Sequence, residues 1–149
     1  MLEYSRLPVR REVASLIAAS GVFGYAPPDN PVVFKCGIRA PLYCNLRKLP
    51  LTPQWRPIMD LTLTELRDGV GAGSIQDFNT ISGVPDGARD HAAALGILHG
   101  YRVLSVPKRV KDHGVKFDFR SLPPGDTILV VEDTSTTSDS LLEFVQLLR

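Results

Sequence analysis

The feature that most constrains the fold of this chain is an unbroken apolar run, TILVV, at Thr127–Val131. A strand with one face in water alternates apolar and polar residues, but this run shows no such alternation. It is typical of a central strand in a parallel sheet, which is buried on both faces. Parallel neighbours are joined by crossover connections, and these are usually helices. The run therefore predicts an α/β fold.

The second half of the chain supplies the other elements that such a sheet needs. Apolar patterns predict strands at Asn79–Val84 and Arg102–Val106, and helices at Ala88–Leu98 and Ser138–Leu148. Lys108–Lys116 is basic and predicts an exposed loop after the second of these strands. Elements in this order predict a mostly parallel central sheet flanked by helices.

The first half of the chain is less regular and richer in proline. Helical spacing of apolar residues predicts a helix at Arg11–Ser20, and two short strands are predicted at Val32–Lys35 and Leu42–Leu46. Thr52-Pro53 has the residues of a helix start. Pro57 makes the interior of that helix doubtful, because proline is tolerated in the first turn but not beyond it.

Size, charge and cysteine content limit the classes of protein to consider. The chain has 149 residues, enough for one domain with a core, and its net charge of +1 creates no global field toward nucleic acid or a membrane. Cys36 and Cys44 lack metal-site spacing and are expected to be reduced. No apolar run is long enough to span a bilayer, and the N-terminus lacks the apolar core of a signal peptide. We expect a cytoplasmic protein that binds neither nucleic acid nor membrane.

The segment with the most chemistry is VVEDTSTTSDS at Val130–Ser140. Ligands in α/β folds bind beyond the carboxyl ends of the strands, where Glu132 and Asp133 are expected to lie. Neighbouring carboxylates suit two sugar hydroxyls and can also hold Mg²⁺, directly or through water. The hydroxyl residues that follow lead to a helix N-terminus, which favours an anion. The alternative is that Ser138 or Asp139 only caps the helix and the acids are solvated.

This segment resembles the phosphoribosyl-pyrophosphate signature of type I phosphoribosyltransferases. That signature is an apolar strand, two acids, two variable residues and then Thr-Thr-Gly-x-Ser. Ser138 replaces the usual glycine, which would permit a positive φ and a close approach of the phosphate. Serine is expected to resist both. The residues that match the signature are Glu132, Asp133, Thr136, Thr137 and Ser140.

Three further segments, in family order, narrow the resemblance to the orotate phosphoribosyltransferases. FKCGIRAPLYCNLRKL at Phe34–Leu49 resembles their N-terminal base-binding segment. ISGVPDGARDHAAALG resembles their glycine-rich pyrophosphate loop and the helix that follows it. PKRVKDHG at Pro107–Gly114 resembles their catalytic loop, with Pro107 in place of an arginine that would meet the pyrophosphate.

The resemblance implies a type I phosphoribosyltransferase fold with an N-terminal hood-like segment and with the family's C-terminal strands missing. It implies a single domain over 1–149, with a base-binding segment at about 1–50 and a core at about 51–149. The implied activity is Mg²⁺-dependent transfer of a 5-phosphoribosyl group from phosphoribosyl pyrophosphate to orotate, giving orotidine 5′-phosphate and pyrophosphate. A homodimer is also implied, in which the Lys108–Lys116 loop is shared across the subunits.

The resemblance assigns roles to individual residues. Lys108, Lys111 and His113 would meet the charge that develops on the leaving pyrophosphate, and His113 can move a proton near neutral pH. Asp133 completes the catalytic set, and Glu132 and Asp133 would hold Mg²⁺ largely through substrate or water. The residues implied in substrate binding are Lys35, Gly83, Glu132, Asp133, Thr134, Thr136, Thr137, Ser138 and Ser140.

Other interpretations stay open at the level of sequence. The basic loop also fits a solvated hairpin tip, Lys35 an edge strand, and Gly83 a strand-to-helix turn. The second hypothesis is a binding or regulatory relative that keeps the sugar-phosphate site but has lost efficient turnover. The third is a Rossmann-like nucleotide binder, which is disfavoured because the chain lacks the GxGxxG and GxxxxGKS/T motifs.

Overall fold

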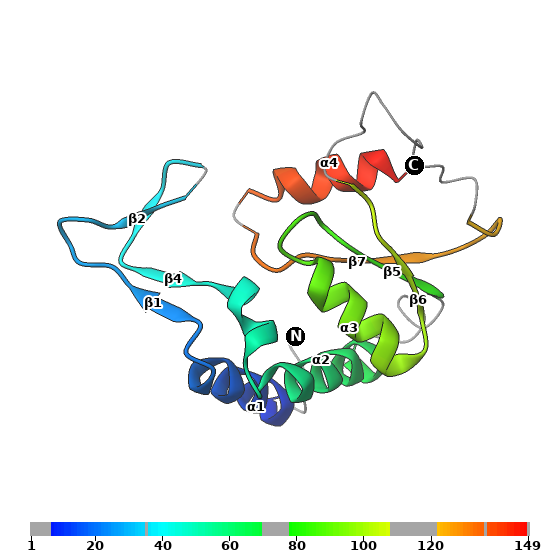
Figure 1. Ribbon diagram of the computed structural model, residues 1–149, viewed down its shortest axis with the longest axis horizontal. Helices are drawn as coiled ribbons and strands as arrows, with labels where there is room; N and C mark the ends of the chain where they lie inside the picture. Colours follow the sequence, from blue (N-terminus) through cyan, green and yellow to red (C-terminus); the bar gives the residue numbers. More distant parts are fainter. Residues whose placement is uncertain (1–6, 35, 70–77, 108–121, 136, 149) are drawn as a thin grey trace. The chain divides into compact units, whose positions relative to one another are not determined.

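The computed structural model describes residues 7–34, 36–69, 78–107, 122–135 and 137–148 (Figure 1). The chain divides into two compact units, Met1–Glu65 and Leu66–Arg149. The single domain with a division at about residue 50 stays a prediction. No helix within the described ranges is both long enough and apolar enough to cross a bilayer.

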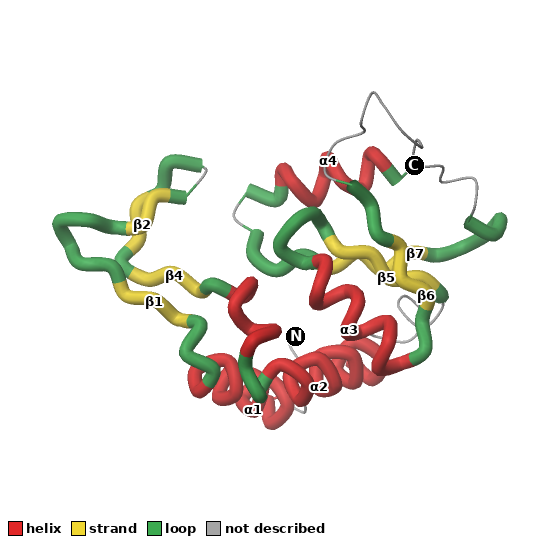
Figure 2. The backbone as a smooth tube through the Cα atoms, viewed as in Figure 1, coloured by secondary structure: helices red, strands yellow, loops and turns green. Residues whose placement is uncertain are grey.

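The first unit contains two small antiparallel sheets that follow a helix. α1 (Leu7–Ala19) precedes β1 (Phe23–Tyr25), β2 (Val32–Val33), β3 (Arg39–Ala40) and β4 (Leu42–Cys44). β1 pairs with β4, and β2 pairs with β3 (Figure 2). The sequence pattern predicts β2 and β4 but misses β1 and β3, because strands of two or three residues are too short to show a period.

Prolines shape the helices that follow. The 3-10 helix η2 (Leu46–Leu51) contains Pro50, and α2 (Trp55–Gly69) begins three residues after Thr52. Pro57 lies in the first turn of α2, where a backbone N–H has no partner within the helix in any case. The helix therefore continues through Pro57, and the doubt raised by this proline is resolved.

The second unit is built on a parallel three-stranded sheet in the order β6-β5-β7. Its strands are β5 (Thr80–Gly83), β6 (Arg102–Leu104) and β7 (Ile128–Val131). α3 (Arg89–His99) connects β5 to β6, and α4 (Asp139–Leu147) follows β7. The predicted α/β class is confirmed, and so are the predicted strands and helices of this half of the chain, with ends shifted by no more than two residues. The predicted loop at Lys108–Lys116 lies outside the described residues.

The two helices of this unit cover opposite faces of the sheet (Figure 1). Ile81 and Val103 are register partners and share one face. α3 covers that face, since Gly96 lies directly against the side chain of Val103. The opposite face carries Leu104, which packs in a cluster with Phe144 of α4. The prediction that Thr127–Val131 is the central strand is wrong for the described sheet, because β5 is the central and fully buried strand, whereas β7 lies at the edge and is half-buried along its length.

A polar network occupies the amino ends of the strands. Arg102 forms an ion pair with Asp126, whose side chain is 5% exposed. Thr80 donates its hydroxyl to Asp126 over 2.8 Å and accepts from Nε of Arg102 at 3.3 Å. These groups satisfy one another, so this edge of the sheet is structural. Ligand chemistry is expected at the opposite, carboxyl edge.

Candidate active site

The carboxyl ends of β6, β5 and β7 meet at one edge of the sheet, because the three strands are parallel. The N–H of Val84 donates to the carbonyl of Val131 over 2.9 Å and extends the β5–β7 pairing. Two segments leave this edge: Val84–Ala88 leads to α3, and Glu132–Ser135 leads toward α4. The acidic residues therefore lie where α/β proteins bind their ligands.

The two segments touch at Gly87 and Asp133. A Cβ atom at Gly87 would lie 2.6 Å from Cγ of Asp133, well inside van der Waals contact. Only glycine leaves room for the carboxylate here. The contact fixes Asp133 against the backbone of the β5–α3 segment, which is the kind of support a ligand-binding carboxylate needs.

Glu132 is half-buried, and its Oε2 atom is buried with no hydrogen-bond partner among the described residues. The pKa of Glu132 is raised above its ordinary value, mainly because the carboxylate is buried and also because of the charge of Asp133. A hydrogen bond with Ser135 offsets part of this rise. An unpaired buried carboxylate oxygen costs free energy in the ligand-free protein. A sugar hydroxyl or hydrated Mg²⁺ would supply the missing partner, so Glu132 fits either ligand.

The Glu132→Gln variant is expected to be more stable than the unmodified protein at neutral pH without ligand. Because the pKa of Glu132 is higher in the folded protein than in the unfolded chain, stability falls as pH rises from the ordinary glutamate pKa through the raised value. Glutamine removes this loss, so the gain should be present at neutral pH and absent below a pH of about 4. Urea denaturation at several pH values measures it.

The control for this experiment is Glu143→Gln, at an exposed position on α4. It removes the same charge without relieving any burial. The same pH-dependent gain in the control would contradict the assignment of the effect to burial of Glu132.

Hydroxyl groups before α4 hydrogen-bond to one another and to the first residue of the helix. The Oγ atoms of Ser135 and Ser138 lie 2.9 Å apart, and Oγ1 of Thr137 donates to Oδ2 of Asp139 over 2.6 Å. Asp139 is exposed and lies where the helix dipole favours negative charge. The side chain of Ser138 makes no capping hydrogen bond, so capping by Ser138 does not explain this segment.

Ser138 has a left-handed backbone conformation, with φ 62° and ψ 8°. It is the only non-glycine residue with positive φ in the part of the chain that the structure describes. A side chain in this region costs about 1–2 kcal/mol. The loop thus keeps the backbone geometry that the usual glycine would permit, although the glycine itself is replaced. Strain of this kind persists where the surrounding structure fixes the backbone.

The Ser138→Gly variant is expected to increase the free energy of unfolding by about 0.5–1 kcal/mol, because relief of the strain exceeds the entropy that glycine adds to the unfolded chain. Guanidinium denaturation measures the change. Ser138→Ala is the control: it removes the same hydroxyl but keeps the Cβ atom, so it should bring no gain. An equal gain from alanine would mean that the strain is not the cause.

Gly83, the last residue of β5, is buried where the chain turns toward α3. A Cβ atom at Gly83 would lie 2.6 Å from the carbonyl carbon of Ala88 and 2.9 Å from Cα of Arg89. The tight return of the backbone therefore requires glycine at this position. The role of Gly83 in substrate binding stays a prediction.

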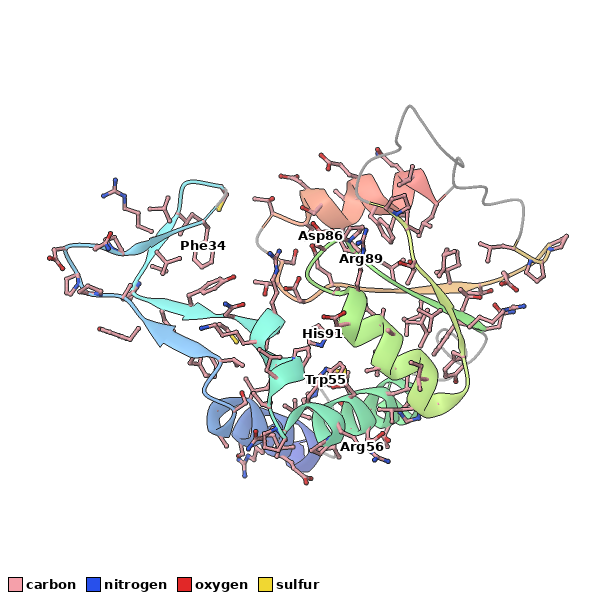
Figure 3. All side chains as sticks on the ribbon, viewed as in Figure 1. Phe34, Trp55, Arg56, Asp86, Arg89 and His91 are labelled. Atoms are coloured by element: carbon pink, nitrogen blue, oxygen red, sulfur yellow. The ribbon has the colours of Figure 1, made fainter. Side chains whose placement is uncertain are left out.

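Arg89 adds a cation to this edge that the sequence pattern does not reveal. Its Nη2 donates to the carbonyl of Val106 over 2.8 Å, and its Nη1 lies 3.5 Å from Oδ1 of Asp86. Figure 3 shows Asp86 and Arg89 together at the start of α3. Val106 directly precedes Pro107, which replaces an arginine in the resemblance. Only the tertiary contact with Val106 brings the guanidinium to this place.

Comparison with known proteins agrees with this geometry. An orotate phosphoribosyltransferase of Porphyromonas gingivalis is 32% identical to the chain over 123 residues, which cover 82% of the chain and 57% of that protein. This chain is a relative of the orotate phosphoribosyltransferases. The crystal structure of the Mycobacterium tuberculosis orotate phosphoribosyltransferase is 27% identical, with a TM-score of 0.62 over 95% of this chain and 76% of that one.

The fold of this orotate phosphoribosyltransferase relative is the type I phosphoribosyltransferase fold. The crystal structure of the Aeropyrum pernix orotate phosphoribosyltransferase matches the chain with a TM-score of 0.67 and 22% sequence identity. The match covers 91% of this chain and 72% of that one. The resemblance inferred from the four segments is thus confirmed. No family model matches the chain. The chain spans about half the length of the curated relatives it matches, 57% and 52% for two of them.

The structure brings part of the predicted site of this chain together. Gly83 ends β5, while Glu132 and Asp133 follow β7 at the same edge. Ser138 and Ser140 lie at the start of α4 and are half-buried, whereas Thr134 and Thr137 are exposed in the segment before it. Five predicted residues lie outside the described residues: Lys35, Lys108, Lys111, His113 and Thr136.

The metal prediction concerns only the two acids. The described residues contain no group of three metal-ligating side chains. Glu132 and Asp133 alone match the pattern that Mg²⁺ often has with phosphate substrates, where one or two carboxylates act together with phosphate oxygens and water.

Proposed function

We propose that this protein transfers the 5-phosphoribosyl group of phosphoribosyl pyrophosphate to orotate, releasing pyrophosphate, with Mg²⁺ as cofactor. The observation that carries the proposal is the contact between Gly87 and Asp133, which ties the acidic end of β7 to the loop after β5. The sequence identity with orotate phosphoribosyltransferases supports the choice of reaction.

The acids and the loop before α4 would bind the sugar phosphate. Glu132 and Asp133 accept hydrogen bonds from the two neighbouring ribose hydroxyls, and the buried Oε2 atom of Glu132 gains a partner. The 5′-phosphate would lie against the hydroxyls of this loop and the backbone N–H groups at the start of α4, where Ser138 holds the left-handed conformation. Mg²⁺ would supply positive charge at the diphosphate and would be held by the two acids largely through substrate or water.

Apart from Asp133, the residues proposed for the chemistry lie outside the described ranges. The glycosidic carbon gains positive charge as its bond to pyrophosphate breaks, and the leaving oxygen gains negative charge. Lys108 and Lys111 would stabilise that charge, and His113 would move a proton. Lys35 would bind orotate. We propose that the protein is a cytoplasmic homodimer in which the Lys108–Lys116 loop serves the site of the partner subunit.

A second candidate is a relative that binds the sugar phosphate without efficient turnover. The observation in its favour is Asp139, whose carboxylate accepts the Thr137 hydroxyl at the start of α4, where the phosphate would lie. A negative charge there weakens the hold on the 5′-phosphate, which favours a site that keeps the sugar phosphate through the two acids but positions it poorly for reaction.

One experiment separates the two candidates. The absorbance of orotate should fall when phosphoribosyl pyrophosphate and Mg²⁺ are added to the protein. Asp133→Asn should weaken binding of phosphoribosyl pyrophosphate about 10-fold or more, whereas Glu143→Gln on the exposed side of α4 should leave it unchanged. Thermal stabilisation by phosphoribosyl pyrophosphate without loss of orotate would support the second candidate instead.

A further inference from the structure

Three polar side chains are connected by hydrogen bonds across the loop between β7 and α4. The Oγ atoms of Ser135 and Ser138 lie 2.9 Å apart. The side chain of Ser135 also hydrogen-bonds to the carboxylate of Glu132. Ser135 therefore links the acid that directly follows the strand to the residue that directly precedes the helix.

The hydroxyl protons give this connection a direction. A serine hydroxyl has one proton to donate and two lone pairs, whereas an ionised carboxylate only accepts. Ser135 donates its proton to Glu132, so it accepts the proton of Ser138. The Ser138 hydroxyl then presents only lone pairs to a ligand, and these are unsuited to a phosphate oxygen. Ser138 would serve a phosphate through its backbone conformation and not through its hydroxyl.

The backbone conformation of Ser138 needs support from its surroundings. Its φ of 62° lies in the left-handed region, where a Cβ atom crowds the following carbonyl oxygen. Glycine, the usual residue of the family signature at this position, adopts the conformation without this cost. A strained residue keeps such a conformation only where neighbouring groups fix it. The hydrogen bond between Ser138 and Ser135 is a constraint of this kind.

We propose that Ser135 is a positioning residue, which orients Glu132 for the ribose and holds Ser138 in the left-handed conformation at the 5′-phosphate. This inference rests on the proposed function and assigns it a further residue. Ser135 occupies one of the two variable positions of the signature, so the resemblance gives it no role. In this chain its hydroxyl offsets the replacement of glycine by Ser138.

Isothermal titration with phosphoribosyl pyrophosphate and Mg²⁺ tests this role. Ser135→Ala should weaken binding about 10-fold, because it removes two hydrogen bonds, one of them to a carboxylate. Ser135→Thr keeps a hydroxyl and should restore the affinity to within about 2-fold of the unmodified protein. In turnover of orotate by Ser135→Ala, the KM for phosphoribosyl pyrophosphate should rise while kcat stays within about 2-fold, because Ser135 acts on binding and not on the reacting atoms.

A double-mutant cycle with Ser138→Gly tests whether Ser135 acts through Ser138. Glycine needs no hydrogen bond to keep a positive φ, so Ser138→Gly alone should leave affinity within about 2-fold. In that background Ser135→Ala removes only the bond to Glu132 and should cost about 3-fold or less. An equal loss of about 10-fold in both backgrounds would overturn the link between Ser135 and Ser138.

Ser20→Ala is the matched control. Ser20 follows α1 in the first unit, and its hydroxyl donates to the carbonyl of Ile17 over 2.6 Å. The substitution also removes a hydrogen-bonded serine hydroxyl, but at a position with no part in the proposed site. It should leave the affinity for phosphoribosyl pyrophosphate within about 2-fold. Urea denaturation of each variant shows whether it is folded under the conditions of the titration.

The outcomes separate the inference from the proposed function. Equal affinity in Ser135→Ala and the unmodified protein, with orotate still converted, would overturn the role of Ser135 and leave the proposed function standing. A loss that Ser135→Thr or Ser20→Ala shares in full would overturn that role as well, because the hydroxyl at this place would not be its cause. If the unmodified protein neither binds phosphoribosyl pyrophosphate nor converts orotate, the proposed function fails and the inference fails with it.

Discussion

Gly87→Ala is expected to weaken binding of phosphoribosyl pyrophosphate about 10- to 100-fold while the protein stays folded. The added Cβ atom would lie 2.6 Å from Cγ of Asp133, so the carboxylate must move away from the β5–α3 segment. The atoms that clash belong to the end of the half-buried Asp133 side chain, which can rotate, so the backbone of the two segments need not move and the protein stays folded. The ribose hydroxyls, however, would lose an acceptor in its proper place. Isothermal titration with phosphoribosyl pyrophosphate and Mg²⁺ measures the loss.

A double-mutant cycle provides the control for Gly87→Ala. In an Asp133→Gly background there is no carboxylate to displace, so adding Gly87→Ala should have almost no further effect on affinity. Additive losses in the double variant would mean that glycine at position 87 serves the ligand directly. They would contradict the idea that Gly87 acts by making room for Asp133.

Gly83→Ala is expected to lower the free energy of unfolding by about 3 kcal/mol, at the upper end of what overpacking usually costs. The Cβ atom would lie 2.6 Å from the carbonyl carbon of Ala88 and 2.9 Å from Cα of Arg89, and both atoms belong to backbone rather than to a side chain that can rotate away. Gly83 is also the last residue of the central strand, so relief of the clash must move the start of α3. Urea denaturation gives the change in stability.

Gly24→Ala is the matched control for Gly83→Ala. Gly24 also lies in a strand, but a Cβ atom added there would have the carbonyl oxygen of Tyr43 as its nearest neighbour, 3.8 Å away, which is an ordinary contact. Its substitution should change stability by less than about 1 kcal/mol. A similar loss at both positions would show that the cost arises from glycine replacement in a strand and not from the return of the loop onto Gly83.

The parts of the fold that the sequence predicts are those with a long enough local pattern. The apolar run at Thr127–Val131 and the alternating elements around it predict the parallel sheet and its two covering helices. β1 and β3 are too short to show a period, and the sequence misses them. Pro57 is ambiguous in the sequence because its effect depends on which turn of α2 it occupies.

In the candidate site, too, the sequence predicts the residues that follow a recognisable strand but not the backbone conformation of the short loop. Glu132 and Asp133 follow a recognisable strand, so their place at the carboxyl edge is predictable from the sequence. Ser138 stands where the family signature has glycine, so the sequence predicts that this residue avoids a positive φ. In the structure Ser138 nevertheless has a φ of 62°. The backbone of a short loop is set by the elements that it joins as well as by its own residues.

The sequence by itself determined the fold class, the order of the strands and helices of the second unit, and the acidic loop that relates this chain to the orotate phosphoribosyltransferases. These properties follow from local periodicity and from residues adjacent in the chain. Only the tertiary structure decided that Gly87 makes room for Asp133 and that Arg89 reaches the carbonyl of Val106. Both contacts join segments from different strands, and no pattern within either segment encodes how closely the parallel sheet brings them together.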